Sequence, residues 1–252
     1  MWFDTHLHLD AAEFDADRAA VIAAAQAAGV DAALLVGVAR RQWASLPAMQ
    51  AAWPGCRLAY GIHPLYLAQA TEDDLPALRS LLAAGTAVAV GEIGLDGFAP
   101  DPDWARQEWF FAEQLKLARE FDLPVVLHIR RAQDRVLKYL RRHRVRGGFA
   151  HAFNGSRQQA EAFIALGFKL GFGGAMTFSG SSRIRALAAS LPLDSLVLET
   201  DAPDIPPAWA QGGRNEPANL TRFGEALAAL RGITPTELAA ACKENVKAVL
   251  GA

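Results

Sequence analysis

The pattern of apolar and polar positions alternates along the whole chain between two kinds of segment. Short runs of β-branched or apolar residues are followed by longer, Ala/Leu-rich amphipathic stretches, a pattern typical of strands that alternate with helices. Strands are expected near residues 2–8, 31–38, 57–63, 87–92, 124–129, 147–151, 168–172 and 195–200. Helices are expected near residues 15–28, 41–52, 72–84, 103–121, 132–144, 156–166, 181–190, 219–230 and 235–249.

Eight strands separated by helices indicate a parallel sheet, because each helical crossover must carry the chain back along the sheet before the next strand begins. In a chain of 252 residues, eight such units favour an α/β fold of the (β/α)8 TIM-barrel type over an open, doubly wound sheet. The sequence contains no linker or low-complexity segment, so we expect one barrel domain over residues 1–252. The Pro/Gly-rich stretch 201–217 is expected to be the longest loop and to leave the last strand at the face where barrel active sites lie.

Turn and cap residues agree with these boundaries. Gly29 is typical of the position after a helix end, and Thr71 before three acidic residues is typical of a helix N-cap. Thr234, followed by a proline and then by Glu237, predicts another helix start.

Composition narrows the class of protein. The net charge of −2 excludes nucleic-acid binding by overall charge alone, so any such contact must be local. Cys56 and Cys242 lack metal-binding spacing and form no disulfide framework, which indicates free thiols in a reducing compartment. The first residues lack the pattern of a signal peptide, and no apolar run approaches the roughly 20 residues of a membrane span. We therefore expect a soluble cytoplasmic protein.

The candidate chemistry lies where the expected strands end. Five of the six histidines occupy such positions, namely His6, His8, His63, His128 and His151, whereas His143 lies in an expected helix. His6 and His8 are two residues apart in a strand and therefore point to the same side. Glu92 ends the fourth expected strand, and Asp201 follows the eighth.

A barrel brings the carboxyl ends of its strands together at one mouth, where these side chains could hold two divalent ions. One arrangement places His6, His8 and Asp201 on the first ion and His128 and His151 on the second, with Glu92 bridging the two. A dication would also offset the cost of burying the carboxylates. The alternative is that each residue is a separate, hydrogen-bonded polar group, and their shared position at strand ends favours the metal site.

Further residues have two interpretations each. His63 is either a phosphate contact or leaving-group donor, or a structural residue held by the turn that ends at Pro64. Arg130 and Arg131 follow His128 and either bind a phosphate, which guanidinium groups match in geometry, or form surface ion pairs. Asp204 either orients a ligand or caps its loop.

Other residues are candidates for the rim of the site. Asn154 is expected to be a polar, substrate-binding rim residue, with Arg214 and Asn215 as further candidates, although Asn215 and Glu216 are better explained as ties of the long loop. The basic run from Arg135 to Arg146 fits a solvated helix face better than a nucleic-acid contact. The aromatic residues Phe153, Trp104 and Trp209 either stack on bases or pack in the core or the loops.

Taken together, the motifs resemble the TatD family of metal-dependent deoxyribonucleases, which are amidohydrolase-like barrels. The matching segments are FDTHLHLD (3–10), GIHP (61–64), VGEIGLD (90–96), QEWFFAEQLKLA (107–118), LPVVLH (123–128), HAFNGS (151–156), LETDAP (198–203) and RNEP (214–217). The resemblance spans nearly the whole chain. It implies a barrel of the metal-dependent hydrolase type, with His6, His8, Glu92, His128, His151 and Asp201 as ligands of two metal ions. Gly97 departs from the pattern, because the family often has an aromatic residue there.

The resemblance also implies 3′-to-5′ exonuclease activity on DNA, supported by magnesium. Metal ions would activate water, with Asp201 as a ligand and general base, Glu92 as the bridge and His63 as a further catalytic candidate. Four imidazoles favour zinc, manganese, iron or cobalt over magnesium on ligand softness, so the identity of the metal stays open. Single-stranded or end-containing DNA is the expected partner, and we expect a monomer without a membrane or an obligate protein partner.

Two other functions stay open at this point. The same two-metal site could hydrolyse an amide, ester, lactone or phosphotriester, or act as a D-aminoacyl-tRNA deacylase, since fold and metals do not separate these reactions. A non-catalytic binding barrel is the remaining alternative, and it would require a broken ligand set.

Overall fold

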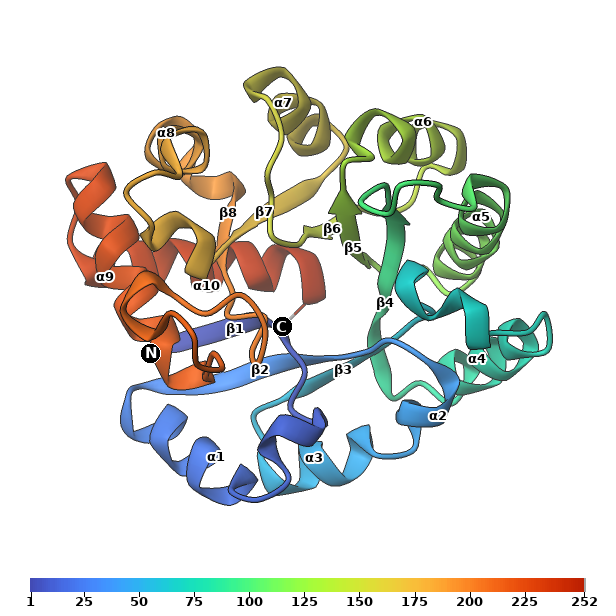
Figure 1. The fold of residues 1–252 in the computed structure, drawn as a ribbon, viewed down its shortest axis with the longest axis horizontal. Coiled ribbons are helices and arrows are strands. Elements are labelled where there is room, and N and C mark those ends of the chain that lie inside the picture. The colour runs from blue at the N-terminus through green and yellow to red at the C-terminus, as the bar shows by residue number, and fades with distance from the viewer. Residues whose placement is uncertain (252) are drawn as a thin grey trace.

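The computed structural model describes residues 1–251, which form an eight-stranded parallel barrel (Figure 1). The strands are β1 (Trp2–Leu7), β2 (Val30–Gly37), β3 (Arg57–Tyr60), β4 (Ala87–Asp96), β5 (Val125–Arg130), β6 (Gly148–Ala150), β7 (Phe168–Phe172) and β8 (Leu196–Leu198). Each strand pairs with the next in chain order. Beyond β8, the Asp201 N–H donates to the carbonyl of His6 and so joins the last strand to the first. The predicted TIM barrel is confirmed.

Helices surround the barrel on its outside, as Figure 1 shows. The α-helices are α1 (Arg18–Ala27), α2 (Arg40–Trp43), α3 (Leu46–Ala52), α4 (Asp74–Ala83), α5 (Trp104–Glu120), α6 (Gln133–His143), α7 (Arg157–Ala165), α8 (Ser182–Ser190), α9 (Leu220–Arg231) and α10 (Pro235–Leu250). Short 3-10 helices are η1 (Ala12–Phe14), η2 (Pro64–Gln69), η3 (Gly174–Thr177), η4 (Leu193–Ser195), η5 (Ala208–Ala210) and η6 (Pro217–Asn219). No helix within residues 1–251 is long and apolar enough to cross a lipid bilayer.

Three sequence-based boundaries were wrong. The helix expected over 41–52 is two helices, because Pro47 cannot lie in a helix interior and instead occupies the first turn of α3. Helix α4 begins at Asp74, whose carboxylate accepts a hydrogen bond from the Thr71 N–H and so closes a turn ahead of the helix. Strand β4 continues past Glu92 to Asp96. The cap at Thr234 was right, since Thr234 and Glu237 form a capping box.

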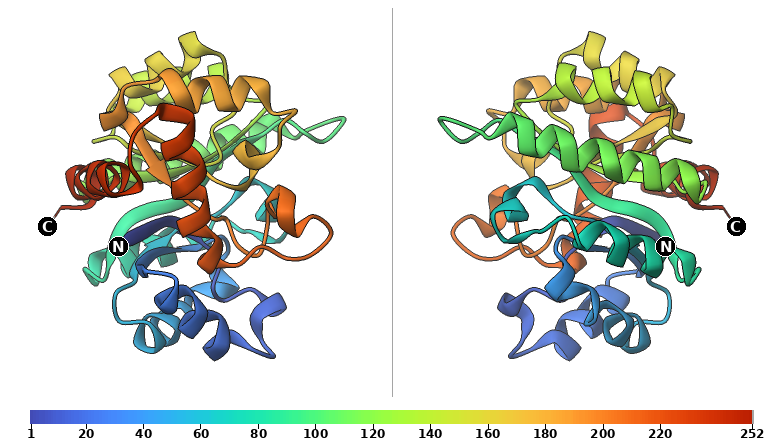
Figure 2. Two further views of the ribbon diagram at one scale, coloured as in Figure 1. Left: turned by 90° about the vertical axis from the view of Figure 1, so that its left-hand side faces the viewer. Right: turned by 90° about the vertical axis from the view of Figure 1, so that its right-hand side faces the viewer.

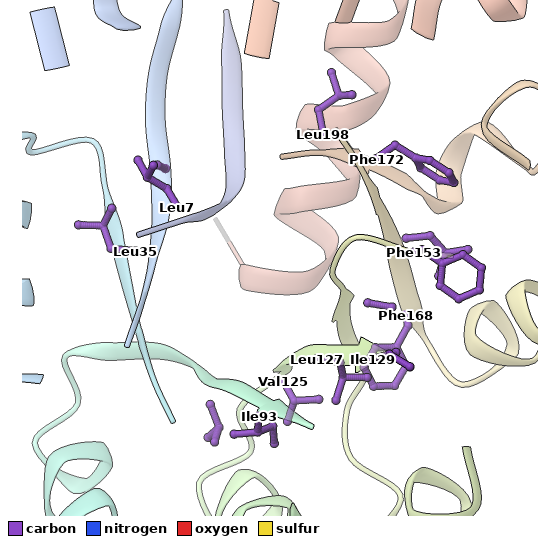
Figure 3. Close-up of a cluster of buried hydrophobic side chains, with 14 of the residues drawn as sticks. Leu7, Leu35, Ile93, Val125, Leu127, Ile129, Phe153, Phe168, Phe172 and Leu198 are labelled. Atoms are coloured by element: carbon purple, nitrogen blue, oxygen red, sulfur yellow. The ribbon is translucent and has the colours of Figure 1, made fainter. Parts of the chain in front are cut away.

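Two apolar clusters hold the barrel together. The larger lies mainly between the sheet and the helices and includes Leu35 and the buried residues drawn in Figure 3. The smaller contains Leu34 and Val36 of β2, the residues that alternate with Leu35, together with Val246 and Val249 of α10. Successive strand residues face opposite sides of a sheet, so this smaller cluster fills the barrel interior and α10 closes one end of it.

The other end of the barrel is open. Figure 2 shows the loops after β4 and β8 projecting on the same side of the molecule, away from both chain ends. A cavity of about 1140 Å³ lies there, at the carboxyl ends of the strands. We call this cavity the mouth.

Candidate metal centre

The mouth brings together most of the residues singled out from the sequence. Its lining includes His8, His63, Glu92, His128, Arg130, Arg131, His151, Asn154, Asp201 and Asp204. His6 does not line the cavity but lies below it, fully buried. The expected ligands therefore come from strands distributed over the whole chain and meet at the base of one cavity.

The first candidate metal position lies between His6, His8 and Asp201. The Nε2 atom of His6 is 3.3 Å from Nε2 of His8 and 3.5 Å from Oδ1 of Asp201, and His8 Nε2 is 3.4 Å from the same oxygen. Ligand atoms that lie about 2 Å from a shared ion are themselves about 3 to 3.5 Å apart. These three side chains therefore have the spacing of a ligand set.

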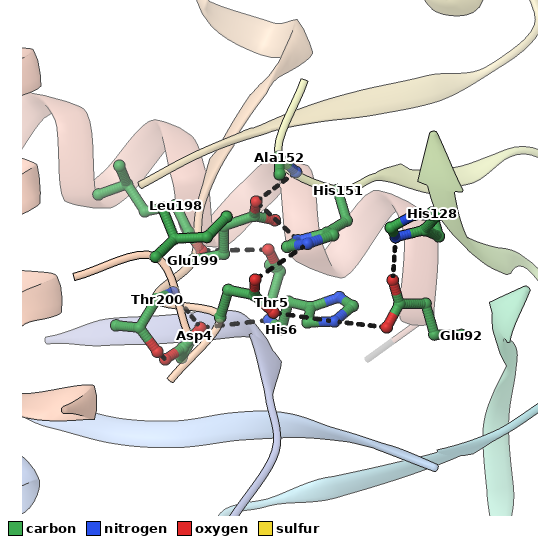
Figure 4. A network of polar contacts seen from close by, with 12 residues as sticks. Asp4, Thr5, His6, Glu92, His128, His151, Ala152, Leu198, Glu199 and Thr200 are labelled. Carbon is green, nitrogen blue, oxygen red and sulfur yellow. Dashed lines mark hydrogen bonds and ion pairs between the residues drawn. The ribbon is translucent and has the colours of Figure 1, made fainter. Parts of the chain in front are cut away.

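Glu92 connects two further groups of candidate ligands. Its Oε2 atom is 3.1 Å from Nε2 of His6, in a group that also contains His151. Its Oε1 atom is 3.1 Å from Nδ1 of His128 (Figure 4). The same oxygen is 3.3 Å from Nε2 of His63, and the three residues form another group. The two oxygens of Glu92 thus face different histidines, as a bridging carboxylate requires.

One detail of the expected arrangement differs in the structure. His128 and His151 do not share a candidate position among the described residues. The reason is their neighbours: His128 lies on β5 next to the Glu92 strand, whereas the ring of His151 stacks on that of His6 at 3.7 Å. His63, which lies outside the expected ligand set, is the histidine beside His128, with ring centroids 4.2 Å apart.

The donor set fits divalent metal ions. Glu92 and Asp201 are only 2% and 8% exposed, and within residues 1–251 neither forms an ion pair with a lysine or arginine. Two buried carboxylates without a cation carry a large desolvation cost. Imidazole nitrogens and carboxylate oxygens are also the ligands that zinc and manganese prefer.

The pKa values of His8 and Glu92 also indicate that the carboxylates of the site favour positive charge beside them. Burial alone would lower the pKa of His8, but the hydrogen bond and the charge of Asp201 raise it to about 9. Burial would likewise raise the pKa of Glu92, yet the surrounding histidines hold it well below its usual range. Both carboxylates are therefore ionised at neutral pH and draw positive charge towards themselves, a role that a bound dication fulfils.

Two further carboxylates orient the histidines, and the sequence interpretation missed both. Asp96 Oδ2 lies 2.8 Å from Nε2 of His128, and Glu199 Oε1 lies 2.9 Å from Nδ1 of His151 (Figure 4). A carboxylate that accepts one ring N–H fixes the tautomer and leaves the lone pair of the other nitrogen free for a metal. The free nitrogens are then Nδ1 of His128, which faces Glu92, and Nε2 of His151, which is 3.5 Å from Asp201 Oδ2.

Asp96 and Glu199 could have been found from their positions in the sequence. Asp96 follows Glu92 by four positions in β4, an even spacing that places residues on one side of a strand, and Glu199 directly follows β8, ahead of Asp201. Glu199 also needs Gly171 beside it, because a Cβ at position 171 would lie 2.0 Å from its Oε2 atom. The backbone N–H of Ala152 donates to Glu199 at 2.5 Å and completes its placement.

Asp4 ties the two ends of the barrel sheet together below the site. Its carboxylate accepts hydrogen bonds from the His6 N–H at 3.2 Å and the Thr200 N–H at 2.9 Å, and also from the Thr200 hydroxyl. Complete burial raises the pKa of Asp4 to about 7. This contact fixes the segment of His6 against the segment that leads to Asp201, so the first candidate metal position depends on it.

His63 has both a structural contact and a contact with the site. Its Nδ1 atom accepts a hydrogen bond from the Leu65 N–H at 3.1 Å and caps η2. Nδ1 is therefore unprotonated, and in the neutral ring the proton is on Nε2, which points at Glu92. Burial lowers the pKa of His63 to about 4, so the ring is neutral at pH 7 and presents an N–H donor rather than a metal ligand.

An exposed aromatic residue lies at the rim where the sequence has Gly97. Phe98 is 50% exposed and lines the mouth. The guanidinium of Arg130 lies 3.6 Å from the centre of its ring, and that of Arg131 lies 4.8 Å away. Phe98, the residue after Gly97, thus places an aromatic ring at the rim, and sequence reasoning missed it.

The remaining rim residues differ in how they are held. Asn154 accepts a hydrogen bond from Arg183 at 2.6 Å through its side chain, so both lie on the wall of the mouth. Asp204 is anchored through its N–H to the carbonyl of Asp201. Asn215 is fully buried and donates to the carbonyls of Thr200 and Ile205, which confirms that it ties down the long loop.

The basic run and the other aromatic candidates lie away from the mouth. Arg135 pairs with Glu108, and Arg146 pairs with Asp122, on the outer surface, which confirms the solvated helix face. Phe153 is 3% exposed and belongs to the apolar core. Trp104 packs beneath the guanidinium of Arg135, Trp209 beneath that of Arg222, and none of the three lines the cavity.

A (β/α)8 barrel with a cluster of histidines and carboxylates at the carboxyl ends of its strands defines a class of metal-dependent hydrolases. Comparison with known proteins places the chain more narrowly. The family model described as TatD related DNase matches residues 3–251. The chain belongs to the TatD family of metal-dependent hydrolases.

Individual relatives agree with this placement. The chain is 41% identical to the uncharacterized metal-dependent hydrolase YjjV of Escherichia coli over 97% of its own length and 95% of the relative's. A crystal structure of YjjV, described as a TatD homologue, superimposes with a TM-score of 0.96 and covers 100% of this chain and 98% of the other. A Cronobacter sakazakii protein named 3′-5′ ssDNA/RNA exonuclease TatD is 36% identical over 96% of this chain and 95% of its own.

Proposed function

We propose that the protein is a metal-dependent deoxyribonuclease that hydrolyses phosphodiester bonds near the ends of single-stranded DNA. The observation that carries this proposal is the position of Glu92, whose two oxygens face different histidines at the base of a mouth with exposed arginines on its wall. A relative named as a 3′-5′ ssDNA/RNA exonuclease supports it.

Six side chains would hold two divalent ions, with magnesium, manganese and zinc as the candidates: His6, His8, Glu92, His128, His151 and Asp201. When bound, such ions lower the pKa of water and offset the charge that builds on phosphoryl oxygens. Glu92 would serve both, and His63, although it belongs to one of the candidate groups, would stay a hydrogen-bond donor because its Nδ1 accepts from the Leu65 N–H.

Asp201 is the proton acceptor. Its carboxylate is ionised, because the surrounding histidines, His151 first and then His8 and His6, outweigh the effect of burial and lower its pKa. One oxygen faces His8 and the other faces His151, so the carboxylate lies among the candidate ligands and can take the proton of an attacking water. The same carboxyl group can later return the proton to the departing oxygen.

Four other side chains bind and orient the substrate. The neutral ring of His63 donates its Nε2 proton in a hydrogen bond to Glu92 or to a phosphoryl oxygen. Arg130 and Arg131 lie exposed on the mouth wall and offer paired donors that match the geometry of a phosphate. Asn154 marks the rim further along the same wall.

The test uses protein stripped with a chelator and reloaded with Mg²⁺, Mn²⁺ or Zn²⁺, and a labelled single-stranded oligonucleotide. We expect cleavage only after reloading and about two metal ions per chain by elemental analysis. Glu92→Gln and Asp201→Asn should each reduce turnover by about 100-fold or more, whereas Glu161→Gln on the outer face of α7 should not change it. Turnover of esters, lactones or D-aminoacyl-tRNA without oligonucleotide cleavage would overturn the proposal.

A further inference from the structure

The charged side chains of the mouth are separated by sign. Asp10 and Glu13, which follow β1, and Asp204, which follows β8, line one side. We call these three residues the acidic wall. Because β8 adjoins β1 in the barrel, these two loops are neighbours (Figure 1).

The opposite side of the mouth carries only positive charge from arginines. Arg130 and Arg131 come from the end of β5, which lies across the barrel from β1 (Figure 1). Arg183 belongs to α8, but its guanidinium reaches Asn154 in the loop after β6. We call these three residues the arginine wall. The candidate metal positions lie between the two walls.

None of these six side chains has an opposite-charge partner within residues 1–251, although ion pairs are common elsewhere on the surface. Behind the acidic wall, Arg18 is held by the carbonyl of Leu9 and by Asp15. Arg214 is likewise held by Asp17 and Glu216. Both guanidinium groups are therefore engaged with other partners. His8, the remaining basic group close to Asp10 and Asp204, faces Asp201.

On the arginine wall, the guanidinium groups are held without being neutralised. Arg130 stacks on Phe98, and Arg183 donates to the neutral side chain of Asn154. Uncompensated charge of one sign in a cleft acts directly on a charged ligand that enters it. A phosphate is attracted along the arginine wall and repelled along the acidic wall, so a phosphodiester chain can extend from the centre of the mouth in one direction only.

We propose that the acidic wall selects the group at the end of the substrate: it accepts a terminal nucleoside that ends in a hydroxyl and rejects one that ends in a phosphate. The rest of the strand lies along the arginine wall. This inference rests on the proposed phosphodiester hydrolysis, in which the water oxygen bonds to phosphorus, one P–O ester bond breaks and the departing oxygen takes up the proton. It assigns Asp10, Glu13 and Asp204 as specificity-determining residues.

The experiment compares four single-stranded DNAs of one sequence with the metal-loaded protein. They carry hydroxyls at both ends, a phosphate at the 3′ end, a phosphate at the 5′ end, or are closed into a circle. We expect a phosphate at the attacked end to slow cleavage by about tenfold or more, and the circle to resist cleavage, because both place a charged phosphate against the acidic wall. Raising the ionic strength should narrow the difference, since salt screens exposed charges.

The matched variants change the same number of charges in different places. Asp10→Asn with Glu13→Gln and Asp204→Asn should bring the phosphate-ended strand to within a few-fold of the hydroxyl-ended one. Glu72→Gln with Glu225→Gln and Glu244→Gln removes three exposed charges outside the mouth and should leave the preference unchanged.

The possible outcomes distinguish a failure of the proposed end selection from a failure of the proposed nuclease activity. Equal rates for hydroxyl-ended and phosphate-ended strands, release of the terminal phosphate at the same rate, or cleavage of the circle as fast as the linear strand would overturn the inference and leave the nuclease activity standing. Failure to cleave the hydroxyl-ended linear strand with any metal would overturn both. If the triple variant does not fold, the salt dependence of the wild-type protein tests the same inference. A rate difference between hydroxyl-ended and phosphate-ended strands that does not change with ionic strength would overturn it.

Discussion

The Oε1 atom of Glu199 lies 2.9 Å from the Nδ1 atom of His151, and the two residues are both buried at the base of the mouth. Glu199 forms no ion pair with a lysine or arginine within residues 1–251. Its Oε1 atom accepts the Ala152 N–H and lies beside the ring of His151, which we expect it to hold in the tautomer whose Nε2 lone pair faces the candidate metal position.

Replacing Glu199 should weaken metal binding without abolishing folding. For Glu199→Gln we expect the affinity for the activating metal to fall by about 10- to 100-fold, the usual effect of losing a carboxylate that orients a metal-bound histidine. Titration of stripped protein with metal, followed by calorimetry, measures this directly. Saturating metal should restore most of the activity, and a variant that binds metal as tightly as the wild type would contradict the assigned role.

Asp96 should act in the same way on the other side of the site. In Asp96→Asn, an amide N–H can face Nε2 of His128 and shift the ring proton to Nδ1, the atom that lies 3.1 Å from Glu92. The lone pair for the metal is then lost, and we expect metal affinity to fall by about tenfold or more. Asp73→Asn, at an exposed position, is the control, and the measurement is the metal-induced increase in Tm for each variant.

Phe98 should contribute to substrate affinity rather than to the chemical step. Stacking of a base on an aromatic ring is worth about 1–3 kcal/mol, so Phe98→Ala should raise KM for a single-stranded oligonucleotide by about 5- to 100-fold with a smaller change in kcat. Phe98→Tyr should retain most of the affinity. Trp109→Ala removes an aromatic residue that is 39% exposed outside the mouth, and an equal effect there would rule out a specific role for Phe98.

The core should be sensitive to truncation at Phe168, which is 1% exposed in the larger cluster (Figure 3). We expect Phe168→Ala to lower the free energy of unfolding by about 3–5 kcal/mol, because transfer and cavity costs add. Leu65→Ala, at a position that is 61% exposed, should change it by about 0.5 kcal/mol or less. Urea denaturation of the two variants provides the comparison.

The two cysteines should make stability depend on pH in the alkaline range. Burial raises the pKa of Cys56 and of Cys242 to about 12, from the ordinary value of 9.0. A raised pKa in the folded state means that the contribution is complete below pH 9 and is lost as the pH rises towards 12. The unfolding free energy of the wild type should therefore fall more steeply over this range than that of a Cys56→Ala/Cys242→Ala variant. Equal slopes would contradict the burial effect.

Much of the architecture could be predicted from the sequence, because it depends on local patterns. Alternating apolar runs and amphipathic stretches gave the eight βα units in the right order, and caps such as Thr234 were readable from a few neighbouring residues. The metal-ligand candidates could be found for a similar reason. In a parallel barrel all strand ends meet at one face, so the position of His6 or His128 in its strand is enough to place it there.

The partners of those ligands could not be read in this way. Which histidine faces which oxygen of Glu92 depends on how neighbouring strands are twisted and staggered, so the sequence pattern could not show that His63 lies beside His128 or that His151 stacks on His6. The extension of β4 past Glu92 also depends on pairing with β5, whereas the break before α3 could have been read from Pro47.

The sequence by itself determined the barrel, the face that carries the chemistry and the residue types available there, because these follow from periodicities along one chain. Only the tertiary structure decided which carboxylate holds which imidazole, that the ring of Phe98 lies exposed at the rim beside Arg130, and that negative and positive side chains line opposite sides of the mouth. These features are distances between residues up to about two hundred positions apart, and such distances are set by the packing of the whole barrel rather than by any local stretch.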